Sequence, residues 1–180
     1  MKTYISLLRG INVSGQKKIL MADLKAIYEG LGFTAVQTYI QSGNVVFSYK
    51  SKEAAALQKM IFDKIQSHYG FDIPNLILSP TEIKTALSNN PYNDIDKPYL
   101  TFLSAHPLKE NITALANCNF DNEFYELKEK VIYAHFPNGA GKAKMNNNLI
   151  EKKLKISATT RNLRTTKKLL EICTSLCNSD

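Results

Sequence analysis

The stretch TYISLLRGIN, residues 3–12, decides the fold, because an apolar strand over residues 3–8 breaks at Gly10 into a polar loop. A helix follows this loop, and Gly30 or Gly32 provides its stop. Its apolar residues recur at helical spacing, and they are Met21, Leu24, Ile27, Tyr28 and Leu31. The chain therefore begins with a strand, a loop and an amphipathic helix.

Three further segments complete a first structural unit. Residues 35–40 and 44–48 are predicted strands, joined through a turn or bulge at Gln41, Ser42 and Gly43. Ser51 is expected to cap a long helix that ends near Tyr69, and residues 71–78 are predicted to form a fourth strand. The order strand-helix-strand-strand-helix-strand is the split βαβ or ferredoxin-like arrangement.

The remainder of the chain is predicted to be a degenerate second copy of this unit. Its predicted elements are a linking helix, a strand, a helix, a hairpin and a helix, over residues 81–87, 99–104, 109–117, 123–136 and 145–154. Only residues 156–158 are left for a closing strand. The repeat is therefore predicted from the order of elements and not from matching sequence.

The segment ATTRNLRT, residues 158–165, is predicted to open a final helix with Thr160 or Asn162 as its N-cap. A helix N-terminus carries about half a positive charge, so Arg161 and Arg164 there each cost about 0.3–1 kcal/mol unless an anion is present. This helix start is thus a candidate cradle for phosphate or carboxylate. The alternative is that both guanidinium groups extend into water or pair with an acidic loop.

These predictions define an α+β fold with three parts. Residues 1–79 form a ferredoxin-like half, residues 80–160 a second, degenerate ferredoxin-like half, and residues 161–180 a C-terminal helix packed on the body. The chain has 180 residues, of which 44% are hydrophobic. A chain of this size buries about 70% of its unfolded surface, so its core needs neither a metal nor a disulfide.

Composition narrows the cellular setting and the chemistry. No stretch approaches the roughly 20 apolar residues of a membrane span, and the first residues run straight into a strand instead of a signal peptide. We therefore expect a cytosolic protein with no membrane partner. The three histidines are scattered and the three cysteines lack zinc-site spacing, so we expect no metal site and no cofactor.

The formal net charge of +7 is unevenly distributed along the chain. Residues 142–168 hold nine basic side chains against the single acid Glu151, a local charge of +8, whereas residues 31–141 carry −2. A lysine-rich solvated surface is the common meaning of such a run. An anionic partner is the alternative.

Polar motifs interrupt the predicted elements at residues 9–12, 41–44, 138–144 and 159–162. They supply hydrogen-bond donors and positive charge but no carboxylate, which favours holding an anion over general acid-base catalysis. The predicted ligand-binding residues are Arg9, Asn12, Gln41, Ser42, Asn44, Arg161 and Asn162, with Lys142 and Lys144 as closing charges. We expect Arg9, Asn44 and Arg161 to converge within one cleft.

The sequence does not support a nucleotide-hydrolysing phosphate loop or a catalytic serine, because the residue spacing of both motifs is absent. The run GAGKA, residues 139–143, lacks the GxxxxGK[ST] spacing of a phosphate loop and has Ala143 where the magnesium-binding hydroxyl belongs. Ser42 lies outside any Gly-x-Ser-x-Gly pattern, so a serine in a strand bulge is the simpler interpretation.

The motifs YISLLRGINV (residues 4–13), MADL (21–24), YIQSGNVVF (39–47) and ATTRN (158–162) resemble the bacterial family named domain of unknown function 1697. The similarity extends over nearly the whole chain. It implies a cytosolic bacterial protein built from ferredoxin-like α+β units, and it implies no particular activity.

The leading prediction is a protein that binds a small phosphorylated or otherwise anionic ligand. The first alternative is an RNA- or DNA-binding module that uses the basic 142–168 segment, with Tyr4, Tyr39 or Phe47 presented to stacked bases. The second alternative is a hydrolase or transferase whose acid or base lies at an unmarked position, such as His135 or Glu123.

Overall fold

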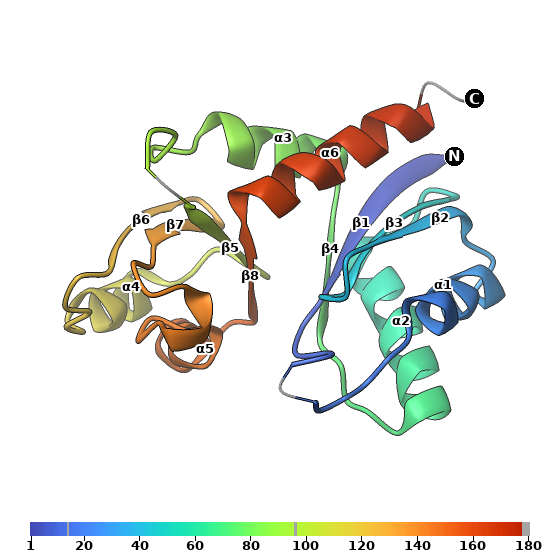
Figure 1. Cartoon of the computed structure of the whole chain (residues 1–180), viewed down its shortest axis with the longest axis horizontal. Helices are drawn as coiled ribbons and strands as arrows, with labels where there is room; N and C mark the ends of the chain where they lie inside the picture. The colour runs from blue at the N-terminus through green and yellow to red at the C-terminus, as the bar shows by residue number, and fades with distance from the viewer. Residues whose placement is uncertain (14, 96, 178–180) are drawn as a thin grey trace. The chain divides into compact units, whose positions relative to one another are not determined.

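The computed structural model describes residues 1–13, 15–95 and 97–177 and has a mixed α+β architecture with two four-stranded antiparallel sheets (Figure 1). Its contacts divide the chain into two units. The first unit comprises Met1–Lys84 together with the chain from Lys168 onward, and the second comprises Thr85–Lys167.

The first unit follows the predicted order of elements. These are β1 (Lys2–Leu8), α1 (Met21–Gly30), β2 (Thr34–Tyr39), β3 (Asn44–Tyr49), α2 (Ala54–Tyr69) and β4 (Asn75–Leu78). The sheet order is β2-β3-β1-β4, so the quoted N-terminal stretch supplies a central strand that pairs antiparallel with both β3 and β4. Residues 4–8 of this strand are buried on both of its faces, which explains its nearly continuous apolar sequence.

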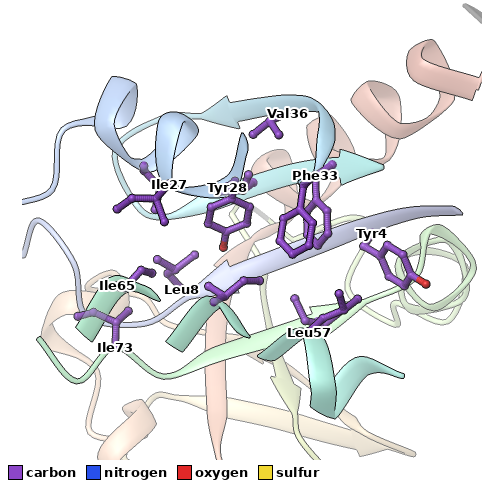
Figure 2. Packing of buried hydrophobic residues seen from close by; sticks show 14 of the residues in the cluster. Tyr4, Leu8, Ile27, Tyr28, Phe33, Val36, Leu57, Ile65 and Ile73 are labelled. Carbon is purple, nitrogen blue, oxygen red and sulfur yellow. The ribbon is translucent and has the colours of Figure 1, made fainter. Parts of the chain in front are cut away.

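The core of the first unit lies between one face of this sheet and the helices α1 and α2 (Figure 2). Along β1, Tyr4 and Leu8 belong to this core, whereas Ile5 and Leu7 point to the opposite face and are also fully buried. The ring of Phe47 stacks between Tyr4, at 5.6 Å, and Phe33, at 4.3 Å between ring centroids. Tyr4 and Phe47 are therefore core aromatics and are not presented to stacked bases.

Two helix starts in this unit show how local chemistry sets the boundaries. The predicted Ser51 cap is wrong: α2 begins at Ala54, and its N-cap is Glu53, without a side-chain cap bond. The helix α3 (Pro80–Ser88) opens with a capping box, because Ser79 Oγ accepts from the Glu82 amide and Glu82 Oε2 accepts from the Ser79 amide. Pro80 suits the first helical position, where no amide donor is required.

The second unit repeats the order of the first. Its elements are β5 (Tyr99–Leu103), α4 (Lys109–Ala116), β6 (Phe124–Lys128), β7 (Val131–His135), the 3₁₀ turn η1 (Ala140–Lys142), α5 (Asn147–Leu154) and β8 (Ala158–Asn162). The sheet order is β6-β7-β5-β8, which corresponds strand by strand to the first sheet. Leu115 of α4 and Ile150 and Leu154 of α5 pack with this sheet in a second core.

The end of the chain differs from the prediction. Residues 158–162 do not open a helix: they form β8, which pairs antiparallel with all of β5, and the closing strand is five residues long. The helix α6 (Leu163–Cys177) begins afterwards. Asn162 is its cap, with Oδ1 accepting from the Thr165 amide at 2.7 Å, whereas the Thr160 hydroxyl bonds instead to Asn147 Oδ1.

Tyr28 gives the first core a measurable dependence on pH. Its buried hydroxyl donates to Ser6 Oγ at 2.7 Å, and burial raises its pKa far above the ordinary value. Above pH of about 10 the unfolded chain loses this proton and the folded chain keeps it, so stability falls as pH rises. We expect Tyr28→Phe to lower the free energy of unfolding by about 1 kcal/mol near neutral pH. The same substitution should reduce the loss of stability at alkaline pH, as measured by urea unfolding.

Ser6→Ala is the matched control for this prediction. It removes the hydrogen-bond partner but leaves the phenol buried, so the alkaline loss should persist. An unchanged alkaline slope in Tyr28→Phe would show that another group causes it.

Candidate functional site

Two loops of the first unit are tied together by one asparagine. Asn12 follows β1 and adopts a left-handed conformation with φ of 54°, which asparagine tolerates better than most residues. Its Nδ2 donates to the carbonyl oxygens of Ile19 at 2.9 Å and Gln41 at 3.0 Å, and its Oδ1 accepts from the Ile19 amide at 2.9 Å. The loop before α1 is thereby bonded to the turn between β2 and β3.

That turn requires glycine at position 43. Gly43 has φ of +76°, and a Cβ built there would lie 2.7 Å from Leu8 Cβ. The close approach lets the Gly43 carbonyl accept from the Leu8 amide at 2.8 Å. The turn is therefore held against the end of β1, beside the residues that Asn12 bonds.

A pocket of about 360 Å³ opens where these loops meet the start of α1. Its lining consists of two predicted residues and five that the motifs did not indicate: Asn12, Gln41, Gly15, Lys18, Ile19, Leu20 and Met21. This volume falls in the range of about 300–1,000 Å³ that small-molecule sites occupy. All of these residues belong to the first unit.

The charge in the pocket comes from Lys18, an exposed side chain that the motif search overlooked. The neighbouring Lys17 is used differently, because its ammonium group donates to the Asp72 carbonyl at 2.8 Å. At the start of α1 the N-cap is Leu20, whose side chain makes no cap hydrogen bond. In the sequence, the signal that could have indicated this site was the pair Lys17 and Lys18 shortly before a helix whose N-cap is apolar.

The other predicted residues of the first unit have structural contacts. Asn44 is fully buried, and its Nδ2 donates to the Tyr39 carbonyl and to Ser42 Oγ, which closes the β2–β3 turn. Ser42 is thus a residue of the β2–β3 turn, and the irregularity in the pairing of these strands lies between Thr34 and Gln37 instead. The Arg9 backbone amide donates to the Pro74 carbonyl at 2.9 Å, which fixes the end of β1.

The glycine-rich run near Lys142 is closed by an acid of its own unit. Glu123 accepts from the amides of Lys144 and Met145 at 2.6 and 2.8 Å, and the Lys142 amide bonds to the Gly139 carbonyl. The backbone amides of Lys142, Lys144 and Met145 are therefore all hydrogen-bonded within the second unit. The Lys144 ammonium group forms an ion pair with Asp121.

Arg161 lies in strand β8 and not in the first turn of a helix. Only 8% of its surface is exposed, and one guanidinium nitrogen donates to Thr159 Oγ1 at 3.0 Å and to the Thr160 carbonyl at 2.9 Å. Desolvation by burial lowers the pKa of Arg161 to about 10. The prediction that Arg161 opposes the dipole of a helix is therefore wrong. The free-energy cost of this charged side chain comes from its burial instead.

The predicted site residues divide between the two units. Arg9, Asn12, Gln41, Ser42 and Asn44 belong to the first unit, and Lys142, Lys144, Arg161 and Asn162 belong to the second. The structure joins Asn12 and Gln41 directly. A shared cleft for Arg9, Asn44 and Arg161 stays a prediction.

The structure also shows where the residues of the two alternative functions lie, nucleic-acid binding and catalysis. The basic segment is distributed over η1, α5, β8 and α6, where Arg161 is buried and Lys168 pairs with Glu171 at 2.9 Å. The ring of His135 stacks on Phe124, with 5.0 Å between centroids. No group of three His, Cys, Asp or Glu side chains suited to a metal occurs in the described residues. Within that same part of the chain, no helix combines the length and apolar character of a membrane span.

Two four-stranded antiparallel sheets with corresponding strand orders place this chain among the mixed α+β proteins. It belongs to the family described as Protein of unknown function (DUF1697), whose model matches residues 1–133, and the resemblance seen in the motifs is confirmed.

The comparison with solved structures found the conserved bacterial protein SP0830 from Streptococcus pneumoniae. It is 24% identical, the match covers 96% of this chain and 98% of that chain, and the TM-score is 0.74. This likeness shows the fold. The comparison with curated proteins found no match.

Proposed function

We propose that this protein binds a small anionic ligand in the pocket at the start of α1, with Lys18 as the cation and Asn12 and Gln41 shaping the polar side. The observation that carries the proposal is the pocket itself: about 360 Å³, with a lysine in its lining. The hydrogen bonds of Asn12 hold its loops in place without a ligand, so little ordering cost is added on binding.

The charges around the pocket support an anion. Residues 1–30 contain five basic and two acidic side chains, a local charge of +3. Of the two acids, Asp23 accepts from the Tyr69 hydroxyl at 3.0 Å and does not line the pocket. Lys18 is therefore the charge that a ligand in the pocket meets, and its field attracts anions.

The composition of the lining favours binding over catalysis. Among the lining residues that the structure describes, none is histidine, cysteine, aspartate or glutamate, so Lys18 has no such group beside it in the lining to share proton transfer or nucleophilic attack. The proposed site does not include Asn44, Arg161 and Asn162, because the hydrogen bonds described above use them in a turn, a strand and a helix cap.

We also propose that both units are ferredoxin-like and that the protein is bacterial and cytosolic. The strand orders β2-β3-β1-β4 and β6-β7-β5-β8, each with two connecting helices, support the fold assignment. The bacterial source of the structural neighbour supports the origin. An experimental structure with β1 or β5 at the edge of its sheet would contradict the fold assignment.

Sulfate tests the binding proposal in a thermal melt. A ligand bound only by the folded state adds RT ln(1 + [L]/Kd), so sulfate at about tenfold its Kd adds about 1.4 kcal/mol, or about 3–5 °C in Tm. We expect this rise relative to sodium chloride at equal ionic strength, and we expect Lys18→Gln to abolish it.

Lys64→Gln is the control for that measurement, because it removes the same charge from an exposed position on α2. It should leave the sulfate response intact. Equal responses to sulfate and chloride, or a full sulfate response in Lys18→Gln, would overturn the proposal.

A further inference from the structure

We infer that the ligand of this pocket is an organic anion, such as an aryl phosphate, whose apolar body lies against Leu20 while its anionic group meets Lys18. This inference rests on the proposed function and adds the chemical class of the ligand.

The size of the pocket is the first argument. The pocket volume of about 360 Å³ lies in the range that sites for organic ligands occupy, about 300–1,000 Å³. An inorganic anion occupies only part of such a volume. A ligand that fills the pocket must carry further atoms beyond its charged group.

The wall of the pocket is the second argument. Three consecutive lining residues, Ile19, Leu20 and Met21, are apolar. Ile19 is buried, but Leu20 is 69% exposed although it lies at the N-cap of α1, where polar side chains are preferred. An apolar side chain at this position contributes contact area to a ligand and no helix cap.

Exposed apolar residues also neighbour the lining residues in sequence. Six large apolar side chains are exposed in the described part of the chain, and three of them, Val13, Leu20 and Ile40, lie in the pocket lining or next to it in sequence. Val13 follows Asn12 and Ile40 precedes Gln41, the two residues that the Asn12 hydrogen bond joins. Exposed apolar side chains on the loops that form a pocket offer contact area to a ligand with an apolar body.

The backbone of Ile40 adds an independent observation. Its φ is 48°, a left-handed conformation that β-branched residues rarely adopt. Such strain persists where the surrounding contacts fix the chain, and it concentrates at ligand sites. Here it holds a half-exposed isoleucine next to Gln41.

Three probes separate the parts of the inference: inorganic phosphate, phenyl phosphate and benzyl alcohol, each titrated into the full chain by isothermal calorimetry. We expect phenyl phosphate to bind at least about tenfold more tightly than inorganic phosphate, a difference of about 1.4 kcal/mol. Burial of about 55 Å² of apolar surface supplies that much at about 25 cal/mol per Å². Benzyl alcohol, which has the ring but no charge, should bind more weakly than phenyl phosphate.

Leu20→Ala tests the apolar contact, and Leu108→Ala is its matched control. Leu108 is the N-cap of α4, is 62% exposed and has φ of −69° and ψ of 146°, against −70° and 140° for Leu20. Leu20→Ala should remove most of the preference for phenyl phosphate and leave inorganic phosphate binding unchanged. Leu108→Ala should change neither, and Lys18→Gln should weaken both phosphates.

The outcomes distinguish this inference from the proposed function. Equal affinities for the two phosphates, both lost in Lys18→Gln, would overturn the inference and leave anion binding standing. Binding of neither phosphate would overturn both. Benzyl alcohol binding as tightly as phenyl phosphate would overturn the anionic part, and a preference unchanged in Leu20→Ala would overturn the role of Leu20.

Discussion

Replacing Gly43 with alanine is expected to lower the free energy of unfolding by about 2–5 kcal/mol, because left-handed strain and forced overpacking add. The new Cβ would lie 2.7 Å from Leu8 Cβ and 3.0 Å from Ile11 Cδ1. Leu8 belongs to a central strand and cannot retreat without disturbing the core. Equilibrium urea denaturation followed by circular dichroism measures the loss.

Gly30→Ala is the control for this substitution. Gly30 is the last residue of α1, and a Cβ there meets no atom within 4 Å. Alanine should therefore stabilise the protein by about 0.4–1 kcal/mol. A Gly43→Ala protein as stable as the parent would show that the turn does not approach β1 as described.

Asn12→Ala is expected to lower the free energy of unfolding by about 2.5–5.5 kcal/mol, which makes it the other large effect. The substitution removes three side-chain hydrogen bonds, each worth about 0.5–1.5 kcal/mol, and places alanine in a left-handed conformation at about 1 kcal/mol more. Urea denaturation gives the loss, with the m value checking that the unfolded state is unchanged.

Asn12→Gly separates the two contributions. Glycine accepts the positive φ without strain, so this variant loses the hydrogen bonds alone and should be the more stable of the two. Because the Gln41 bond is lost in both, both should also bind phosphate less well than the parent. Equal stability of Asn12→Gly and the parent would contradict the assigned bonds.

Much of the fold could be predicted from the sequence, because strand and helix periodicities are local. The strands around Ile5 and Val46 and the helices around Ile27 and Ile61 appear where their apolar spacing predicts them. The residues at which helices begin were harder to predict. Ser51 is a good capping residue by type, but α2 begins at Ala54, after Glu53.

The segment at residues 158–162 shows why local signals fail. Thr-Thr-Arg-Asn before an apolar stripe has the composition of a helix start, yet threonine also suits strands. Pairing with β5 selects the strand, and this partner lies about 60 residues earlier in the chain, at Thr101 opposite Thr160. The polar character of Arg161 was visible in the sequence, but its burial follows from that pairing.

The candidate pocket could be predicted only in part from the sequence, for a similar reason. Asn12 and Gln41 belong to polar motifs that indicate a site, whereas Leu20 is an ordinary leucine until the loops are closed around it. Lys18 follows Lys17 in the sequence, and the two lysines look equivalent there. In the structure Lys17 donates to the Asp72 carbonyl, whereas Lys18 lines the pocket. Distant contacts, and not residue types, decide which of these side chains reaches the pocket.

The division of the chain also has a consequence for its synthesis. The second unit is one continuous segment, Thr85–Lys167, but the first unit includes residues after Lys168, among them the buried Leu169 and Cys173. A ribosome delivers the chain from its N-terminus, and domains generally fold as units during this process. In the growing chain the second unit therefore becomes complete once Lys167 has been added, whereas the first unit receives its remaining residues, on α6, only afterwards.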